Sequence, residues 1–143
     1  KAVPEQAALL IVGDIDQPHS WTAPVDVART LITVASDPRG WGRAWHVPSN
    51  PPRSQREAVG DIAKAAAVPP VKVSRLPAIM LWAVGLVQPT IRELKETDYQ
   101  RERPYLLDDE AARATFGLEP TSWDDILTEL VAHYRAAAAQ PSA

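Results

Sequence analysis

Arginine is the residue type in this chain best suited to hold a negatively charged small molecule. Its planar guanidinium donates hydrogen bonds in a fork that matches phosphate and carboxylate oxygens. Arg53 stands just before a predicted helix start, where the helix dipole adds attraction for an anion, and Arg101 and Arg103 lie together in the segment RERP. These three arginines are candidate substrate-binding residues. The alternative is a solvated charged surface shared with Glu93, Glu96 and Glu102.

His19 and Trp21 are two further candidates, and they lie close together in one polar loop. A neutral imidazole holds phosphate weakly, whereas an indole ring offers an apolar face to a sugar or a base. For Trp21 the alternative is structural burial. The three histidines of the chain have no i,i+3 or i,i+4 partners among themselves, so we expect no metal site. The chain contains no cysteine, which excludes disulfides and thiolate chemistry.

Alternating strands and helices are expected in the first half of the chain. The apolar run from Ala7 to Val12, closed by Gly13, predicts a buried strand. A helix from Pro24 to Ala35 follows, and because it is apolar nearly all round it should be buried between two layers. We expect a second strand from Arg43 to Val47. Ser54 and Glu57 have the spacing of a capping box, which predicts a helix start.

The second half of the chain favours helices. After Pro69 and Pro70, the alternation from Val71 to Leu76 predicts an edge strand. Helices are then expected over 77–87 and 90–101. Asp108 should cap a helix that reaches Phe116, with Gly117 after its end, and Ser122 should cap a last helix with one apolar stripe. Residues 136–143 are expected to form a flexible tail.

Three segments, in this order and spacing, resemble the NAD-dependent epimerases and dehydratases, the extended short-chain dehydrogenase/reductase family. VGDIDQPHSWTAPVDVA, residues 12–28, is similar to the strand, loop and helix start of that family, although His19 stands in place of its substrate-binding arginine. GRAWHVPSNPPRSQRE, residues 42–57, and LDDEAARATFGLEPTSWDDIL, residues 107–127, resemble two later blocks. The resemblance covers the carboxyl-terminal half of such an enzyme and implies an α/β fold: a partial Rossmann-like sheet of few strands with a mostly helical substrate-binding lobe.

Two motifs that the complete enzyme needs do not occur in this chain. A glycine-rich turn is required to cradle the cofactor's pyrophosphate, and the sequence has neither G-x-x-G-x-x-G nor G-x-G-x-x-G. The family's base is a tyrosine followed four residues later by lysine, but Tyr99, Tyr105 and Tyr134 are followed at that distance by Arg103, Asp109 and Ala138. We therefore expect no catalytic residue and no bound cofactor in this chain alone, with NAD or NADP bound by the parent protein.

The composition is that of an ordinary water-soluble domain. We expect this domain to span residues 1–135 and to lie in the cytoplasm. The net charge of −3 argues against nucleic-acid binding, and the longest apolar run, Ala78 to Val87, is too short for a membrane span. The expected partners are a small-molecule substrate, the amino-terminal cofactor half and a second copy of the chain in a homo-oligomer, with no nucleic acid and no membrane.

The sequence thus leaves two functional hypotheses. In the first, the chain is the substrate-binding portion of an NAD(P)-dependent epimerase, dehydratase or reductase that acts on a nucleotide sugar or a similar metabolite with a hydroxyl or carbonyl group. This portion would be inactive without its cofactor half. In the second, the chain is a non-catalytic binding or regulatory module that pairs with itself or a partner through the apolar helix expected at 78–87.

Overall fold

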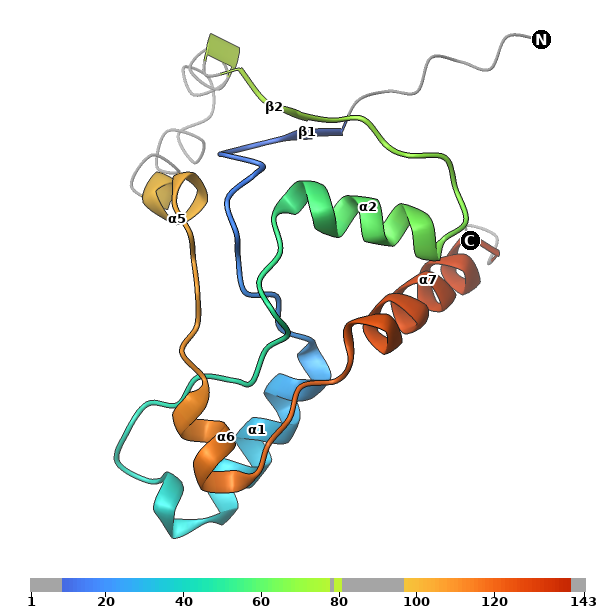
Figure 1. Ribbon diagram of the computed structural model, residues 1–143. Helices are drawn as coiled ribbons and strands as arrows, with labels where there is room; N and C mark the ends of the chain where they lie inside the picture. Colours follow the sequence, from blue (N-terminus) through green and yellow to red (C-terminus); the bar gives the residue numbers. More distant parts are fainter. Residues whose placement is uncertain (1–8, 78, 81–96, 140–143) are drawn as a thin grey trace, which may run out of the picture. The chain divides into compact units, whose positions relative to one another are not determined.

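The computed structural model describes residues 9–77, 79–80 and 97–139 (Figure 1). The fold is mixed α/β, with a two-stranded parallel sheet and several helices. The chain divides into two compact units, whereas the sequence suggested one domain over 1–135. We call Lys1–His19 with Arg53–Tyr105 the sheet unit, and Ser20–Pro52 with Leu106–Ala143 the helical unit.

The sheet unit is built on two short strands, β1 (Leu9–Ile11) and β2 (Val73–Arg75), which lie side by side in Figure 1. They pair in parallel with Leu9 opposite Val73. Parallel strands require a crossover connection, and helix α2 (Gln55–Ala65) lies within it. Both strands fall inside the ranges predicted from the sequence, of which residues 7 and 8 lie outside the described residues. The expected burial of the first strand is wrong, because Leu9 and Leu10 are 43% and 49% exposed. The unit also contains the short helix α5 (Asp98–Glu102).

The capping box predicted at the start of α2 is confirmed. The Ser54 hydroxyl accepts the Glu57 amide at 3.2 Å, and the Glu57 carboxylate accepts the Ser54 amide at 2.8 Å. Two orphan donors of the helix start are thereby satisfied reciprocally. Ala58 and Ala63, on one side of α2, are buried.

Helix α2 ends in a Schellman motif that uses alanine where glycine is usual. The Val68 amide donates to the Ala63 carbonyl and the Ala67 amide to the Lys64 carbonyl, both at 3.0 Å. Ala67 has φ 50°, the left-handed conformation in which its Cβ crowds the backbone. This position therefore holds local strain.

Ala67→Gly is expected to stabilise the sheet unit by about 0.5–1 kcal/mol. Relief of the left-handed conformation gains about 1–2 kcal/mol, from which the greater unfolded-state entropy of glycine subtracts about 0.5–1. The measurement is the free energy of unfolding from denaturant titration. Ala65→Gly, two residues earlier but inside the helix, should instead destabilise by about 0.5–1 kcal/mol. Two changes of the same sign would contradict the strain argument.

The helical unit contains α1 (Pro24–Ser36), the 3₁₀ turn η1 (Pro38–Gly40), α6 (Glu110–Phe116) and α7 (Trp123–Ala139). The predicted cap at Ser122 is confirmed, because its hydroxyl accepts the Asp125 amide at 3.2 Å. The predicted cap at Asp108 is wrong: Asp108 accepts the Glu110 amide at 3.3 Å, but the N-cap residue of α6 is Asp109, whose side chain makes no cap hydrogen bond. Gly117 has φ 65° at the end of α6, a conformation that glycine adopts without steric cost.

Helix α1 has the predicted bounds within one residue, but its orientation contradicts the expectation of all-round burial. Asp26 and Thr30 are buried, at 2% and 5% exposure, whereas Leu31 and Ile32 are 65% and 68% exposed. The polar side chains face inward because the residues that bind Asp26 are supplied by the distant loop around Thr121. The helix is therefore inverted relative to an ordinary amphipathic helix.

The strand predicted from Arg43 to Val47 is wrong, because this segment is an irregular loop. The loop is held through side chains instead of a strand ladder. Trp45 donates its indole N–H to the Gly40 carbonyl at 2.8 Å and packs edge-on against Phe116, with ring centroids 4.8 Å apart. The Arg43 guanidinium lies 4.0 Å from the centre of the Trp45 ring. These contacts give the aromatic and basic residues of the segment their partners without a strand.

Some predicted elements lie partly or wholly outside the described residues. Of the helix expected over 77–87, only Ile79 and Met80 are described as helical, and of the helix expected over 90–101, the described part is the beginning of α5. At the other end α7 runs to Ala139, four residues into the segment for which a flexible tail was expected. Among the described residues no helix is long and apolar enough to span a membrane.

Candidate functional site

The carboxyl edge of the parallel sheet gathers several charged residues within the sheet unit. Gly13 and Asp14 follow β1, and Arg75 is the last residue of β2, so both strands deliver polar groups to one edge. The Leu76 amide donates to the Ile11 carbonyl at 2.8 Å and extends the pairing to this edge. In open α/β sheets, ligands bind at the carboxyl ends of the strands.

Asp14 is held ionised at this edge by hydrogen bonds. The Gln17 amide nitrogen and the Asp16 backbone amide each donate to its carboxylate at 3.0 Å. These two bonds, joined by the nearby charge of Arg75, keep the pKa of Asp14 below its ordinary value against a smaller opposing effect of burial. A carboxylate already bonded in this way repels an anion, so the ligand-holding groups of the edge must be its cations.

Helix α5 closes over the same edge. The Asp14 amide donates to the Arg101 carbonyl at 3.0 Å, and Arg75 forms an ion pair with Glu102. A Cβ placed on Gly13 would lie 2.5 Å from the Arg101 Cβ, closer than non-bonded carbon atoms approach. The helix backbone therefore packs directly against the glycine at the end of β1, which brings Arg101 to the sheet edge.

His19 joins three separate stretches of the sheet unit. Its backbone exchanges two hydrogen bonds of 3.0 Å with Arg53, and next to it the Tyr105 amide donates to the Pro18 carbonyl at 3.0 Å. Its ring nitrogens also face backbone carbonyl oxygens: Nδ1 lies 2.9 Å from that of Gln17 and Nε2 2.8 Å from that of Gln100. With both nitrogens engaged, the geometry favours a positioning role for His19 over direct contact with a substrate.

Arg53 is also engaged within the protein. Its Nε lies 3.1 Å from the Asp61 carboxylate. The helix start that follows is occupied as well, because the Arg56 amide donates to the Ile15 carbonyl at 3.2 Å and the capping box takes the Glu57 amide. The anion-binding site expected at this helix start is therefore already occupied by groups of the chain itself.

Arg103 differs from the other predicted arginines in its accessibility. It follows the last residue of α5, is exposed, and makes no ion pair within the part of the chain that the structure describes. Tyr105, 45% exposed, lies two residues further on, directly beside the His19 bridge. Arg103 is thus a cation on the surface of the segment that covers the sheet edge.

Trp21 lies in the helical unit and is 37% exposed. The sheet unit therefore brings together His19, Arg53 and Arg101, and Arg103 follows α5 in the same unit. Trp21 is not part of this group. Sequence reasoning missed Asp14, Arg75 and Glu102. Their signal was their position: Asp14 comes soon after the predicted strand 7–12, Arg75 lies near the end of the predicted strand 71–76, and Glu102 stands between Arg101 and Arg103.

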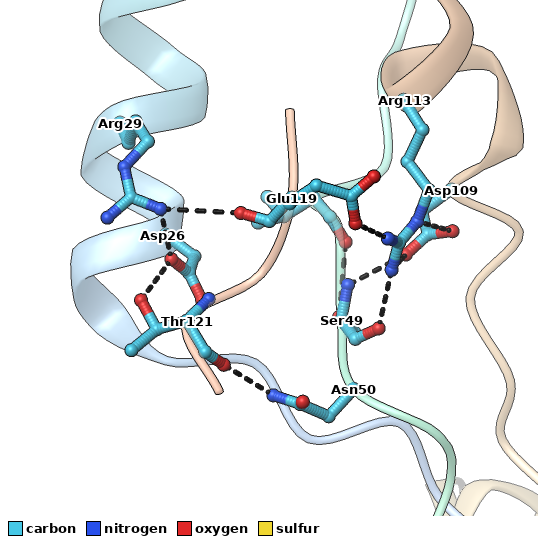
Figure 2. A network of polar contacts seen from close by, with 9 residues as sticks. Asp26, Arg29, Ser49, Asn50, Asp109, Arg113, Glu119 and Thr121 are labelled. Atoms are coloured by element: carbon cyan, nitrogen blue, oxygen red, sulfur yellow. Dashed lines mark hydrogen bonds and ion pairs between the residues drawn. The ribbon is translucent and has the colours of Figure 1, made fainter. Parts of the chain in front are cut away.

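A second cluster of polar side chains lies in the helical unit and holds parts of that unit together (Figure 2). Asp109 accepts the Ser49 amide at 2.7 Å and the Arg113 Nε at 3.0 Å, and Arg113 also donates to the Ser49 carbonyl at 2.9 Å. Glu119 forms a further ion pair with Arg113. Every polar atom named here has a partner inside the unit, so the cluster joins α6 to two loops without offering a binding site.

The ionised state of Asp109 should make this unit sensitive to acid. Burial alone would raise the pKa of Asp109, but hydrogen bonds from Arg113 and the Ser49 amide outweigh it and hold the pKa below the ordinary value. A group with a lowered folded pKa contributes stability above its unfolded value of about 3.9, and this is lost as the pH falls through the folded value.

We therefore expect the denaturant midpoint to fall as the pH is lowered below about 5, and to fall less steeply in Asp109→Asn. Asp109→Asn should also be less stable at pH 7, because the amide group cannot accept from both Ser49 and Arg113 with full charge. Asp124→Asn, an exposed position on α7, is the control and should leave the acid slope unchanged. Equal slopes in wild type and Asp109→Asn would contradict this role.

Within the described residues no group of three His, Cys, Asp or Glu side chains is placed to hold a metal ion. Comparison of the chain with known protein families, curated proteins and solved structures finds no match.

Proposed function

We propose that this chain is the substrate-binding portion of an NAD(P)-dependent epimerase, dehydratase or reductase, whose substrate is a nucleotide sugar or a similar metabolite. Its two-stranded sheet would be the end of a larger Rossmann-like sheet. Without the amino-terminal cofactor half the chain would be inactive, because the glycine-rich turn and the Tyr-x-x-x-Lys pair are missing from it.

The observation that carries the proposal is the convergence of three segments within the sheet unit, one of which, around α5, also bonds to Asp14 at the carboxyl edge of the parallel sheet. The loop after β1, the residues before α2 and the segment that follows α5 are far apart in the sequence, with 34 positions between His19 and Arg53 and 86 between His19 and Tyr105, yet His19 pairs with Arg53 and lies beside Tyr105. These are the segments in which the sequence placed candidate substrate-binding residues. Parallel sheets bind ligands at this edge, and guanidinium groups suit a diphosphate.

Within this site we assign different roles to the candidates. Arg103 is the one we expect to contact the anionic group of the substrate, since it is exposed and forms no ion pair with a described residue. Arg53 and His19 fix the loop through Asp61 and the backbone. Arg101 positions α5 against Gly13. Trp21 belongs to the helical unit and receives no role in this site.

The cofactor requirement is tested by expressing the chain together with any segment encoded upstream of Lys1. NADPH and NADH fluorescence titrations should be flat for the 143-residue chain and saturable for the longer protein. Saturable binding by the purified 143-residue chain would overturn the half-enzyme proposal. A longer protein that has no glycine-rich turn and binds neither cofactor would overturn it as well.

The substrate site is tested in that longer protein with UDP-glucose and UDP as probes. Arg103→Gln should remove a charge-assisted hydrogen bond worth about 1.5–3 kcal/mol, which is a loss of roughly 10- to 150-fold in affinity, with cofactor binding unchanged. Arg39→Gln is the matched control, because Arg39 is exposed and paired with Asp37 in the helical unit. Equal affinities for wild type and Arg103→Gln would show that Arg103 is a solvated surface residue that does not contact the substrate.

A further inference from the structure

The sheet unit contains a pocket between helix α2 and the chain that returns from it to β2. Its volume is about 700 Å³, within the range of about 300–1,000 Å³ that is usual for small-molecule sites. All the described residues that line it belong to the sheet unit, so its walls do not depend on the helical unit. It lies beside the start of β2, whereas Asp14 and Arg101 meet beyond the end of β1.

The pocket forms because α2 and the chain that follows it are joined at two places and leave space between them. At one place the Val68 amide donates to the Ala63 carbonyl at 3.0 Å, and at the other the Arg56 guanidinium donates to the Val73 carbonyl at 3.5 Å. Gly60 lies between them in the pocket wall, and a Cβ placed on it would meet no atom within 4 Å. Glycine inside a helix is less favourable than alanine, so this open position does not serve the stability of α2.

Apolar groups make up most of the pocket wall. Ala63 and Val73 are buried in it, while Val68, Pro70 and Val71 are exposed beside it. Water against such a wall is released when an apolar molecule takes its place. The wall therefore favours a ligand with an apolar body.

The described charged groups that line the pocket are all positive, although the chain has a net charge of −3. Arg56 is already paired, with its Nε 2.7 Å from the Asp16 carboxylate. Lys64 and Lys72 form no ion pair with any residue that the structure describes. Because α2 and β2 run in opposite directions (Figure 1), the end of α2 and the start of β2, and hence both lysines, lie at the same end of the sheet unit.

We propose that this pocket binds a small carboxylate that carries an apolar chain or ring, with the carboxylate at Lys64 and Lys72 and the apolar body against Gly60. Ammonium groups donate charge-assisted hydrogen bonds to carboxylate oxygens. A bare inorganic anion would leave the apolar wall in water, and a neutral apolar molecule would leave both lysines without a counter-charge. The proposal uses none of the residues assigned to the nucleotide-sugar site, so it does not rest on the proposed function.

Octanoate and its neutral counterpart octanol are the probes, titrated into the isotope-labelled chain and followed by NMR. Octanoate should bind with a dissociation constant on the order of 0.1–1 mM, as expected of a ligand with about ten non-hydrogen atoms. The double variant Lys64→Gln/Lys72→Gln should weaken octanoate binding at least about fivefold and change octanol binding by less than about twofold. Arg39→Gln removes an exposed cation of the helical unit and should change neither affinity.

Gly60→Leu tests whether the probes occupy this pocket. Its side chain should fill the space in the wall and weaken the binding of both probes at least about tenfold. The denaturant midpoint should not fall, because leucine is a better helix former than glycine, and this separates a filled pocket from an unfolded chain. Ala65→Leu places the same side chain on an exposed position of α2 outside the pocket wall and should leave both affinities unchanged.

Four results would overturn the proposal. The first is the absence of saturable octanoate binding up to about 10 mM. The second is a double lysine variant with unchanged octanoate affinity, or with an equal loss for octanol, because no carboxylate would then be recognised. The third is unaltered binding in Gly60→Leu, which would place the probes elsewhere on the chain. The fourth is inorganic phosphate that binds as tightly as octanoate, since the apolar wall would then have no role. These titrations contain no NAD(P) or nucleotide sugar, so this proposal and the proposed function fail separately.

Discussion

Replacing Asp26 with alanine is expected to lower the free energy of unfolding of the helical unit by about 2–3 kcal/mol. Asp26 is 2% exposed, and its carboxylate accepts the Thr121 amide at 2.9 Å and the Thr121 hydroxyl at 2.7 Å. Removal of the carboxylate leaves both donors without their acceptor, and hydrogen bonds to charged groups contribute more than neutral ones. Denaturant titration followed by circular dichroism measures the loss.

Two control variants separate this contribution from the ion pair that Asp26 also makes. Arg29→Ala removes a partner whose side chain is 47% exposed, so it should cost no more than about 0.5 kcal/mol. Thr121→Val removes only the hydroxyl donor. A double-mutant cycle between Asp26→Ala and Thr121→Val should give a coupling energy of about 0.5–3 kcal/mol, and additivity of the two variants would contradict the direct bond.

Asp26 also shows why the sequence predicted the bounds of α1 but not its buried face. Pro24 at the first turn and the apolar content are local signals, and they predicted the helix start and its length. The buried face is decided by Thr121, 95 positions away, and by Asn50, whose side chain donates to the Thr121 carbonyl (Figure 2). An apolar pattern alone cannot contain that information.

Local chemistry likewise explains which other elements were predicted. The capping box of Ser54 and Glu57 and the cap at Ser122 use residues three positions apart, so the sequence contains both partners within one turn. A strand was expected at 43–47, but a strand requires a neighbour. Here the His46 ring lies 2.8 Å from the Asp108 carbonyl, and Ser49 donates to Asp109, so these polar groups bond to the α6 region.

The sequence predicted which residues could bind an anion, but not the geometry in which they lie. The arginines were chosen because guanidinium suits phosphate, and His19, Arg53 and Arg101 do come together in the sheet unit. The sequence does not show that Asp61 pairs with Arg53, or that two carbonyl oxygens face the His19 ring. These contacts form only when the chain folds. These internal partners leave Arg103 as the candidate most open to a ligand.

Gly13→Ala is expected to have the largest effect on the sheet unit, a loss of about 2–4 kcal/mol in the free energy of unfolding. Gly13 has φ 96°, a conformation that costs other residues about 1–3 kcal/mol, and the new Cβ would collide with the Arg101 Cβ and lie 3.0 Å from its carbonyl oxygen. Overpacking of this kind costs a further 1–3 kcal/mol or so. Because the contact is with helix backbone, it cannot be relieved by a side-chain rotation.

Gly60→Ala is the matched control, because Gly60 lies inside α2 and a Cβ there would meet no atom within 4 Å. That substitution should stabilise by about 0.5–1 kcal/mol, so the two Gly→Ala changes should have opposite signs.

In Gly13→Ala the strain should be relieved by movement of α5 away from the sheet edge, which breaks the bond from the Asp14 amide to the Arg101 carbonyl. Faster hydrogen exchange at the Asp14 amide would report that movement directly. Arg103 follows α5 directly, so UDP-glucose affinity of the longer protein should fall in Gly13→Ala and not in Gly60→Ala. Unchanged stability and exchange in Gly13→Ala would show that α5 does not pack on this glycine.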